Sequence, residues 1–421
     1  MGIQNLLPFV KNACRQSNIR EIAGHSVAVD VSCLLHRGLF GCASAVAQGQ
    51  QTDFYVKYVA KYVNILVSIG CHVILVFDGK PLPAKKEINN ARRERRDFNK
   101  RKGDQLLSEG KPSEAYSFFK RCTTITAEVV NKTIEALKDL DMVDILVAPY
   151  ESDAQLAFLT KTNKAYAVIT EDSDLIPFGC ERIIFKLNHK DGSCTIYERN
   201  NLPKCFKGTL GKEFDFTKFR RICILAGCDY LQSGLPGVGL SKATTFFSKA
   251  SGWDLRQVLP RLPRYLNMKS LNVKKEFIED FIRAENTFLY QIVYDTSERR
   301  QRPLNDYPVM AINNLGDHDE DDFVGVTMTD DSDGVDYSYA GEIQPAMLAI
   351  RLALGHNLES ESSMSDKFFL HSEPPEWSIW SQEFKPGVQR MIAKKNKEKN
   401  TCGAFTVSCP QKKVVKYIAL L

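Results

Sequence analysis

Four short apolar runs, each leading into an acidic residue, constrain the fold of this chain more than any other feature. They cover residues 25–30, 72–78, 144–149 and 165–170. Runs of this kind are typical of strands that are buried on both faces of a parallel sheet. The stretches between them, such as residues 53–68, repeat apolar side chains every three or four positions, as amphipathic helices do. This alternation predicts an α/β fold with a mostly parallel central sheet flanked by helices.

The later part of the chain has a different pattern. Residues 182–187 and 194–197 flank the turn Lys190-Asp191-Gly192, which predicts a β-hairpin at an edge of the sheet. From residue 216 to about residue 295 the pattern is helical. Beyond residue 357 the periodicity is lost, and clusters of Ser, Glu and Lys predict a weakly ordered basic tail.

Cysteine and histidine usage argues against a structural zinc site. None of the 12 cysteines forms a C-x-x-C pair, and the 7 histidines have no zinc-ligand spacing. Because the chain starts without a recognisable signal peptide, its thiols indicate a reducing compartment. No apolar stretch reaches the ~18 residues that span a membrane, and Leu6 stands where a myristoylation motif requires Ser or Thr.

Seven carboxylates occupy the positions where an open α/β sheet binds its ligands. Six of them follow the four apolar runs and the seventh follows a helix: Asp30, Asp78, Glu151, Asp153, Asp172, Asp174 and Asp229. So many negative groups in one crevice must either take up protons or bind a cation. Oxygen donors without Cys or His favour Mg²⁺ or Mn²⁺, and this number of donors could hold two ions roughly 4 Å apart. Such a pair can activate water against a phosphodiester without a nucleophilic side chain.

The alternative is that each acid only caps a helix or a turn after a strand, which is common in α/β proteins. For a single aspartate that interpretation is the better one. The repetition of Glu-x-Asp and Asp-x-Asp after successive strands, at Glu151 and Asp172, favours the metal site.

A basic run between the second and third acidic positions, residues 84–102, is compatible with a helix but contains few apolar residues. Lys85, Arg92 and Arg96 are spaced seven and four apart, so a helix would place them on one face, where they could bind the phosphates of a strand. A solvated charged helix or a nuclear localisation signal is the alternative. The neighbouring acids favour phosphate binding.

A glycine-bearing turn interrupts the helical region after Asp229. Gly237 and Gly239 allow a close approach to phosphates, and the helix that begins near Lys242 offers free amide groups and the positive end of its dipole. These features predict a helix-hairpin, or helix-two-turn-helix, that binds the DNA backbone. An ordinary turn between helices remains the alternative.

Long motifs over about residues 1–355 resemble the structure-specific 5′ nucleases, which include flap endonucleases, and within them most closely the eukaryotic exonuclease-one proteins. The family motifs are residues 1–3, 29–30, 76–79, 148–157, 170–174 and 227–230. The motifs typical of exonuclease-one proteins are residues 178–180, 281–291 and 339–341.

The resemblance implies roles for individual residues. The seven acids would bind two Mg²⁺ ions, which Mn²⁺ can replace, directly or through water. Among them Asp30, Asp78, Glu151 and Asp172 would be catalytic, together with Lys85 and Arg92 on the arch. The residues expected to contact DNA are Gly2, His36, Arg95, Arg96, Gly237, Gly239 and Lys242. A potassium ion at the hairpin would involve Ser233 and Asp229.

The resemblance also implies an activity: metal-dependent hydrolysis of DNA from 5′ ends. Such a protein is a 5′ to 3′ double-strand exonuclease with 5′ flap endonuclease activity, and it works in DNA repair, mismatch repair and recombination. Its substrates are double-stranded DNA with 5′ ends, nicks, gaps or flaps, and we expect a nuclear monomer with no membrane association. The alternatives are a replication-type flap endonuclease and a non-catalytic DNA-junction binder, although none of the seven acids is missing.

The resemblance divides the chain into a nuclease core, residues 1–356, and the tail, residues 357–421. The core comprises an N-terminal nuclease region (1–100), a helical arch (84–122), an internal nuclease region (128–215), the hairpin region (216–295) and a C-terminal part (296–356). The tail lysines Lys394, Lys395, Lys397 and Lys399 could form a nuclear signal, contact repair proteins or simply be solvated.

Two positions depart from the family pattern. Ser32 stands where exonuclease-one proteins often have an aromatic residue, which removes base stacking there. One extra residue lies between Tyr230 and Gly237, which alters the turn expected to bind potassium.

Overall fold

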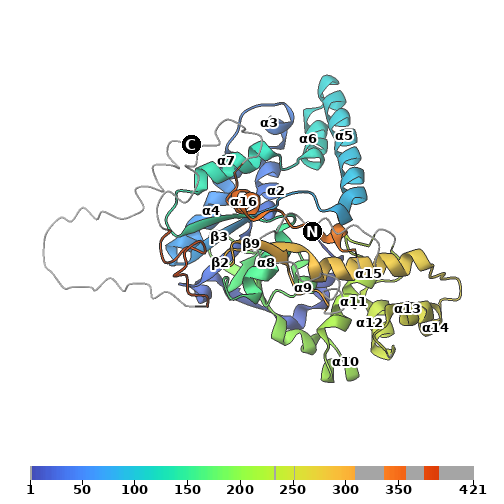
Figure 1. Ribbon diagram of the computed structural model, residues 1–421. Coiled ribbons are helices and arrows are strands. Elements are labelled where there is room, and N and C mark those ends of the chain that lie inside the picture. Colours follow the sequence, from blue (N-terminus) through green and yellow to red (C-terminus); the bar gives the residue numbers. More distant parts are fainter. Residues whose placement is uncertain (1, 232–233, 251, 309–335, 357–373, 388–421) are drawn as a thin grey trace, which may run out of the picture.

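A seven-stranded mixed sheet lies at the centre of this computed structural model, which describes residues 2–231, 234–250, 252–308, 336–356 and 374–387 (Figure 1). The strand order is β1-β7-β6-β5-β2-β3-β4. The strands are β1 (Cys14–Asn18), β2 (Ser26–Asp30), β3 (His72–Phe77), β4 (Val143–Val147), β5 (Ala167–Ile169), β6 (Arg182–Phe185) and β7 (Ser193–Glu198). Strands β6, β5, β2, β3 and β4 run parallel to one another, which confirms the predicted mostly parallel sheet.

The predicted hairpin is present, but its position was predicted wrongly. Strands β6 and β7 pair antiparallel, yet β7 is not the edge, because β1 pairs with its other side. Strand β1 reads Cys-Arg-Gln-Ser-Asn and is partly exposed, so it lacks the apolar run that marked the other strands. Only pairing with a distant segment makes it a strand.

Helices cover both faces of the sheet because successive side chains of a strand point to opposite sides. Val27 and Val29 of β2 pack in a core with one layer of helices, and Ala28 packs in the opposite core. The first layer contains α2 (Val31–Gly41), α4 (Phe54–Ser68) and α7 (Ala127–Leu137). The second contains α8 (Ser152–Lys161), α9 (Leu175–Phe178), α11 (Phe216–Ala226) and α15 (Lys275–Tyr290).

Two helices stand away from the sheet at the top of Figure 1, where the arch is predicted. They are α5 (Lys86–Ser108) and α6 (Pro112–Cys122), preceded by the 3₁₀ turn Pro83–Lys85. Their small shared core contains Leu106 and Phe119. A Cβ at Gly103 would lie 2.6 Å from the Phe119 ring, so the close approach of the two helices requires glycine there. The predicted helical arch is therefore a pair of packed helices.

The predicted helical region is also present, except at its end. It contains α11, α12 (Leu240–Lys249), α13 (Leu255–Val258), α14 (Leu262–Tyr265) and α15, whereas α10 (Thr209–Lys212) lies just before it. The prediction of helix up to residue 295 is wrong, because β8 (Ile292–Asp295) pairs antiparallel with β9 (Arg300–Pro303). The β-branched and aromatic side chains of β8 favour a strand, and all four of its residues are buried. Short helices elsewhere are α1 (Leu6–Phe9), α3 (Ala43–Ala47) and α16 (Ala346–Ala353).

Part of the predicted tail is folded onto the core. In residues 374–387, Ile379 and Trp380 are 2% and 6% exposed and belong to the main hydrophobic core. The prediction of weak order is wrong for this segment, because its apolar side chains find partners on the sheet that no local pattern reveals. The remaining residues beyond 356 lie outside the part of the chain that the structure describes. None of the described helices combines the length and the hydropathy that crossing a membrane requires.

Candidate active site

The carboxyl ends of four neighbouring parallel strands bring the predicted acids to one edge of the sheet. Strand β2 ends at Asp30, Asp78 follows β3, Glu151 follows β4, and Asp172 follows β5. Because these strands run in the same direction, their ends meet, as the sequence predicted. Asp229 comes from the turn after α11.

Hydrogen bonds hold the first two carboxylates in place. Asp30 accepts bonds from the Cys33 backbone N–H (3.3 Å) and the Thr170 hydroxyl (2.6 Å). Asp78 accepts from the Ser152 backbone N–H, at the start of α8, at 2.8 Å. Asp30 thus does cap a helix, as the alternative interpretation supposed, but it also faces the other acids.

Ser32, which stands in place of the expected aromatic residue, takes part in this arrangement. Its hydroxyl donates to Asp78 Oδ2 at 2.6 Å, and the residue is buried. The substitution therefore replaces a ring by a hydrogen bond that orients a carboxylate of the site.

Burial and mutual repulsion raise the pKa values of Asp30, Asp153 and Asp174. Burial, with the charge of Asp78 added, raises the pKa of Asp30 to about 6. Burial, with the charge of Asp172 added, raises the pKa of Asp174 to about 7. Asp153 has its pKa raised well above the ordinary value by burial and by repulsion from Asp172 and Glu151. These carboxylates therefore share one negative environment that favours a cation.

Two arch cations lie against the acids. The ammonium of Lys85 lies 2.5 Å from Glu151 and 3.4 Å from Asp229, and the guanidinium of Arg92 lies 2.6 Å from Asp229. Burial opposes the charge of Lys85, but Glu151, Asp153 and Asp229 hold its pKa above the usual value. Burial likewise opposes ionisation of Asp229, but Lys85 and Arg92 hold its pKa below the usual value. The predicted arch residues therefore reach the predicted carboxylates.

The amino-terminal residues approach the same carboxylates. The Ile3 backbone N–H donates to Asp174 Oδ1 at 2.9 Å. Gly2 has a φ of +84°, and a Cβ there would lie 2.6 Å from Asp174 Oδ1 and would also collide with Asp172. Glycine at position 2 is thus required both by the backbone conformation and by the space. Gly2 therefore lies beside two of the predicted carboxylates, and its role in DNA binding stays a prediction.

The donor set fits a hard divalent cation. All seven predicted ligands are carboxylates, and the raised pKa values of Asp30, Asp153 and Asp174 reflect burial together with an excess of negative charge. Within the described ranges, no three His, Cys, Asp or Glu side chains gather closely enough to hold one ion as a group. Mg²⁺ usually keeps several waters and takes only one or two carboxylates, so this spread suits it better than a metal that needs a complete protein cage.

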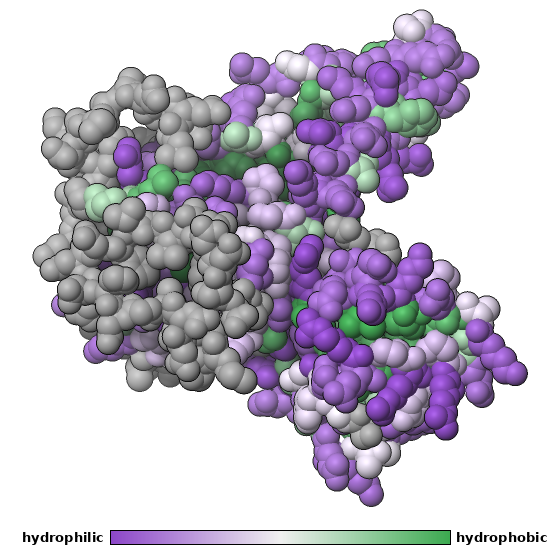
Figure 2. Space-filling view, turned by 45° about the vertical axis from the view of Figure 1, so that its right-hand side comes forward, coloured by the Kyte–Doolittle hydropathy of each residue, from purple (hydrophilic) through white to green (hydrophobic). Residues whose placement is uncertain are grey.

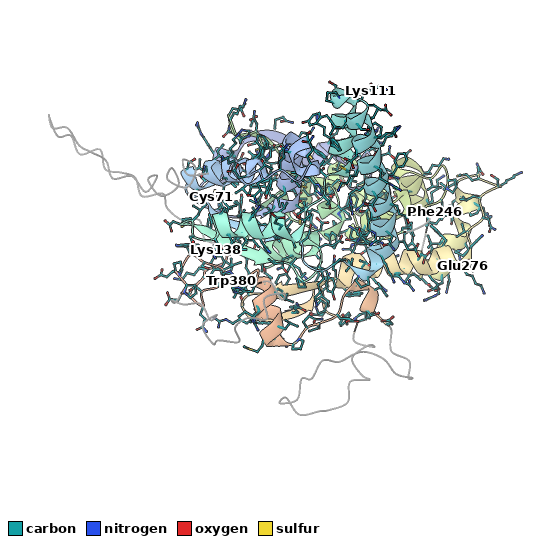
Figure 3. The ribbon with its side chains drawn as sticks, turned by 90° about the horizontal axis from the view of Figure 1, so that it is seen from above. Cys71, Lys111, Lys138, Phe246, Glu276 and Trp380 are labelled. Carbon is teal, nitrogen blue, oxygen red and sulfur yellow. The ribbon has the colours of Figure 1, made fainter. Side chains whose placement is uncertain are left out.

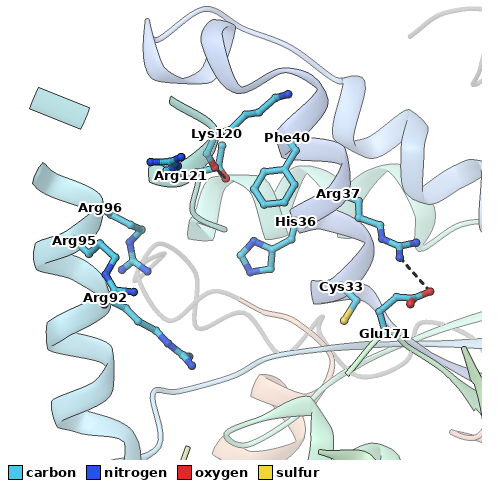
Figure 4. Close-up of a pocket in the computed structure, with 11 residues that line it drawn as sticks. Cys33, His36, Arg37, Phe40, Arg92, Arg95, Arg96, Lys120, Arg121 and Glu171 are labelled. Atoms are coloured by element: carbon cyan, nitrogen blue, oxygen red, sulfur yellow. Dashed lines mark hydrogen bonds and ion pairs between the residues drawn. The ribbon is translucent and has the colours of Figure 1, made fainter. Parts of the chain in front are cut away.

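A basic pocket of about 570 Å³ lies beside the acids, between the arch and α2 (Figure 4). The predicted residues His36, Arg92, Arg95 and Arg96 line it. Figure 4 shows the three arginines extending from α5 toward the ring of His36. Burial lowers the pKa of His36, which favours its neutral form.

Further residues of this pocket were not predicted from the sequence. They are Cys33, Arg37, Phe40, Lys120, Arg121, Thr123 and Glu171. The adjacent pair Lys120-Arg121 at the end of α6 was the one signal that could have indicated them. Figure 2 shows a hollow at the right of the molecule between two largely hydrophilic lobes, the arch above and the helical region of residues 216–290 below.

The glycine turn has the predicted helical setting. It connects α11 to α12, and Gly237 has a φ of +73°, which favours glycine. Gly239 occupies the N-cap position of α12, and the Lys242 ammonium lies 3.5 Å from the Met268 sulfur. Ser233, predicted to contribute to a potassium site with Asp229, lies outside the described residues. Binding of DNA or potassium at this turn stays a prediction.

Two protein-family models match the chain: the XPG N-terminal domain over residues 1–99 and the XPG I-region over residues 142–229. Exonuclease 1 from Danio rerio is 41% identical over 411 residues, which cover 93% of this chain and 48% of that protein. Exonuclease 1 from Xenopus laevis is 45% identical over 307 residues, which cover 73% of this chain and 41% of that protein. The chain thus spans about half, or less, of the length of these relatives.

A shorter relative matches over most of its own length. The DNA damage-inducible protein DIN7 of Saccharomyces cerevisiae is 30% identical over 315 residues, which cover 74% of this chain and 71% of that protein. Among solved structures, the catalytic core of Rad2 in complex with a DNA substrate has a TM-score of 0.50 and 19% identity. That match covers 68% of this chain and 86% of the Rad2 chain, and it indicates a shared fold.

Proposed function

The chain belongs to the structure-specific 5′ nuclease family, in the branch of the exonuclease 1 proteins, and from this premise we propose that it hydrolyses DNA phosphodiesters from 5′ ends. The observation that carries the proposal is the meeting of six buried or half-buried carboxylates and the exposed Asp78 with Lys85 and Arg92 at one sheet edge. Carboxylates with cationic side chains beside them suit the hydrolysis of a phosphodiester. Metal ions held by the carboxylates would lie on one side of the phosphate, and the cationic side chains would supply positive charge on the other side.

The metal ligands in this proposal are Asp30, Asp78, Glu151, Asp153, Asp172, Asp174 and Asp229. Two Mg²⁺ ions bound there would supply an activated water and stabilise the leaving oxygen. Ser32, Thr170 and the start of α8 orient Asp30 and Asp78 through hydrogen bonds, so these ligands are positioned in advance.

Lys85 and Arg92 would neutralise the charge that develops on the scissile phosphate. A single well-placed donor of this kind contributes about 3 kcal/mol to lowering the barrier. Both side chains pair with carboxylates in this structure. When DNA binds, each would exchange its carboxylate partner for the phosphate.

The basic pocket beside the carboxylates would take the 5′-terminal strand. Six cationic side chains line it: Arg37, Arg92, Arg95, Arg96, Lys120 and Arg121. Phosphate contacts of this kind bind DNA without reading its sequence. The hairpin around Gly237 would hold the duplex through backbone amides, with Lys242 alongside. Unpairing the strand end to reach the metals costs a few kcal/mol.

Cleavage of end-labelled DNA tests the proposal. Duplexes, nicks and flaps labelled at the 5′ or the 3′ end are incubated with Mg²⁺ or with EDTA, and the products are sized. We expect products from 5′ ends that require the metal, and we expect Asp172→Ala to lose nearly all cleavage while it still binds DNA. Asp306→Ala is the matched control, because the Asp306 side chain is 84% exposed and far along the chain from the site residues. Full activity of Asp172→Ala would overturn the site assignment.

The sizes of the products separate the candidate activities. Mononucleotides released from a recessed 5′ end favour a 5′ to 3′ exonuclease. Oligonucleotides released only from flaps favour a replication-type flap endonuclease, and binding without cleavage favours a junction-binding protein. We propose that the protein acts in the nucleus in DNA repair, including mismatch repair and recombination. This part of the proposal is based on its relatives, which are named as exonucleases and as a DNA damage-inducible protein. A monomeric state, and contacts of the tail with repair proteins, belong to the same proposal.

A further inference from the structure

The second edge of the sheet is covered by a distant segment of the same chain. Strand β4 is the outermost strand on that side, and among the described strands it pairs with β3 alone. An edge strand exposes unpaired backbone groups and invites association with other chains. Nevertheless, four of the five residues of β4 are buried. Residues 374–387, here named the strap, contribute to this cover.

Asp144 of β4 is the main polar contact of the strap. One carboxylate oxygen accepts a hydrogen bond from the Ser378 hydroxyl at 2.7 Å. The other accepts from the Ile379 backbone N–H at 2.7 Å and lies 2.9 Å from Nε2 of the buried His72. A carboxylate that is only 6% exposed and has three polar partners is a specific docking point rather than a chance surface contact.

Tryptophan side chains anchor the strap on either side of Asp144. The indole N–H of Trp380 donates to the backbone carbonyl of Ile145 at 3.3 Å, which satisfies an acceptor of the edge strand. The Trp380 ring lies 5.9 Å from the ring of Tyr294 in β8, and the Trp377 ring lies 5.3 Å from His72. The strap therefore bridges the large sheet and the small one.

The contacts continue from the strap toward the active site. Tyr294 exchanges two hydrogen bonds with the buried side chain of Gln155, at 2.9 and 2.7 Å. Gln155 belongs to α8, the helix that begins directly after Glu151. Figure 3 shows Trp380 on the opposite side of the molecule from Phe246 and Glu276 of the helical region.

We propose that the β4 edge, with His72 and Asp144, is a docking site for the Ser-Ile-Trp sequence of the strap, and that this intramolecular docking holds the sheet edge closed. The segment that fills this docking site is the strap of the same chain, because its polar groups bond to Asp144 and its Trp380 ring packs in the core. The folding unit of the core then extends to residue 387 rather than ending near residue 356. This inference concerns stability and holds whether or not the protein cleaves DNA.

Substitutions in the full-length chain test the proposal. Trp380→Ala should lower the midpoint of thermal unfolding by roughly 5 °C, because it removes a buried indole and its hydrogen bond. It should also speed hydrogen exchange of the backbone amides of residues 143–147. Trp253→Ala is the matched control, because Trp253 is 60% exposed on the helical region, and it should change neither measurement.

A second variant and an added peptide keep the test decisive. If Trp380→Ala does not fold, Ser378→Ala, which removes a single donor to Asp144, should give a smaller shift and the same local increase in exchange. A synthetic peptide of residues 374–387, added in excess to Trp380→Ala, should restore protection of residues 143–147. Unchanged exchange in both variants would overturn the docking site. A loss of dimers on substitution, measured by sedimentation, would overturn the intramolecular assignment in favour of a second copy.

Discussion

Replacing Lys85 by methionine should destabilise the protein in the absence of divalent metal, and much less in its presence. The Lys85 ammonium is 2.5 Å from Glu151 and 3.4 Å from Asp229, and its side chain is 8% exposed. At an effective dielectric constant of about 20 these contacts represent roughly 7 and 5 kcal/mol of attraction, which the loss of hydration largely offsets. Removing one partner of such a buried group leaves the other charge uncompensated, at a cost of about 3–5 kcal/mol.

Mg²⁺ should reduce this cost, because ions bound by the carboxylates replace the missing positive charge. Unfolding in urea, measured in EDTA and in saturating Mg²⁺, gives the free energy of unfolding in both states. Cleavage in Mg²⁺ should still fall about 10²–10³-fold, because a donor to the phosphate is lost.

The matched control for this experiment is Lys164→Met, which breaks another buried ion pair, with Asp295 at 2.8 Å, outside the carboxylate site. It should lose similar stability in EDTA and in Mg²⁺. If Lys85→Met lost as much stability with Mg²⁺ as without it and cleaved DNA normally, the reasoning about both the metal and the cation would be refuted.

Three further predictions concern other parts of the molecule. Gly2→Ala should lower cleavage, because the positive φ costs about 1 kcal/mol and the new Cβ displaces Asp172 and Asp174; normal cleavage of end-labelled DNA would contradict the packing described for residue 2. Lys164→Met should be most destabilising at neutral pH. Despite burial, Lys164 holds the pKa of Asp295 below its usual value. The ion pair therefore stabilises the fold above pH ~4, and that stabilisation is lost as the pH falls through the folded-state pKa of Asp295. Urea unfolding at pH 7 and pH 3 measures the effect, and an equal loss of stability at both pH values would be the contrary result. Arg121→Ala should weaken DNA binding and reduce by about one the slope of log affinity against log salt, with cleavage at saturating DNA retained; a salt slope equal to that of the parent would remove Arg121 from the DNA path.

The sequence by itself determined the sheet and the position of the carboxylates on it. An apolar run that ends in an acid specifies both a buried strand and the residue at its carboxyl end, and parallel strands place such ends together. Asp30, Asp78, Glu151 and Asp172 could therefore be assigned to one site without coordinates. Arg92 and Arg96 followed from helical spacing, which is also a local property, whereas Lys85 lies in the 3₁₀ turn before α5 and not in the predicted helix.

Only the tertiary structure decided which distant surfaces meet. Strand β1 has no apolar pattern and becomes a strand through its pairing with β7, about 180 residues away in sequence. Asp144 and Ser378 are separated by 234 positions, and nothing near either residue indicates the other. Local sequence encodes which side chains prefer burial, whereas the partner against which each is buried depends on the packing of the whole chain. For this reason the strap and the Lys120-Arg121 wall of the basic pocket were recognised only in the folded molecule.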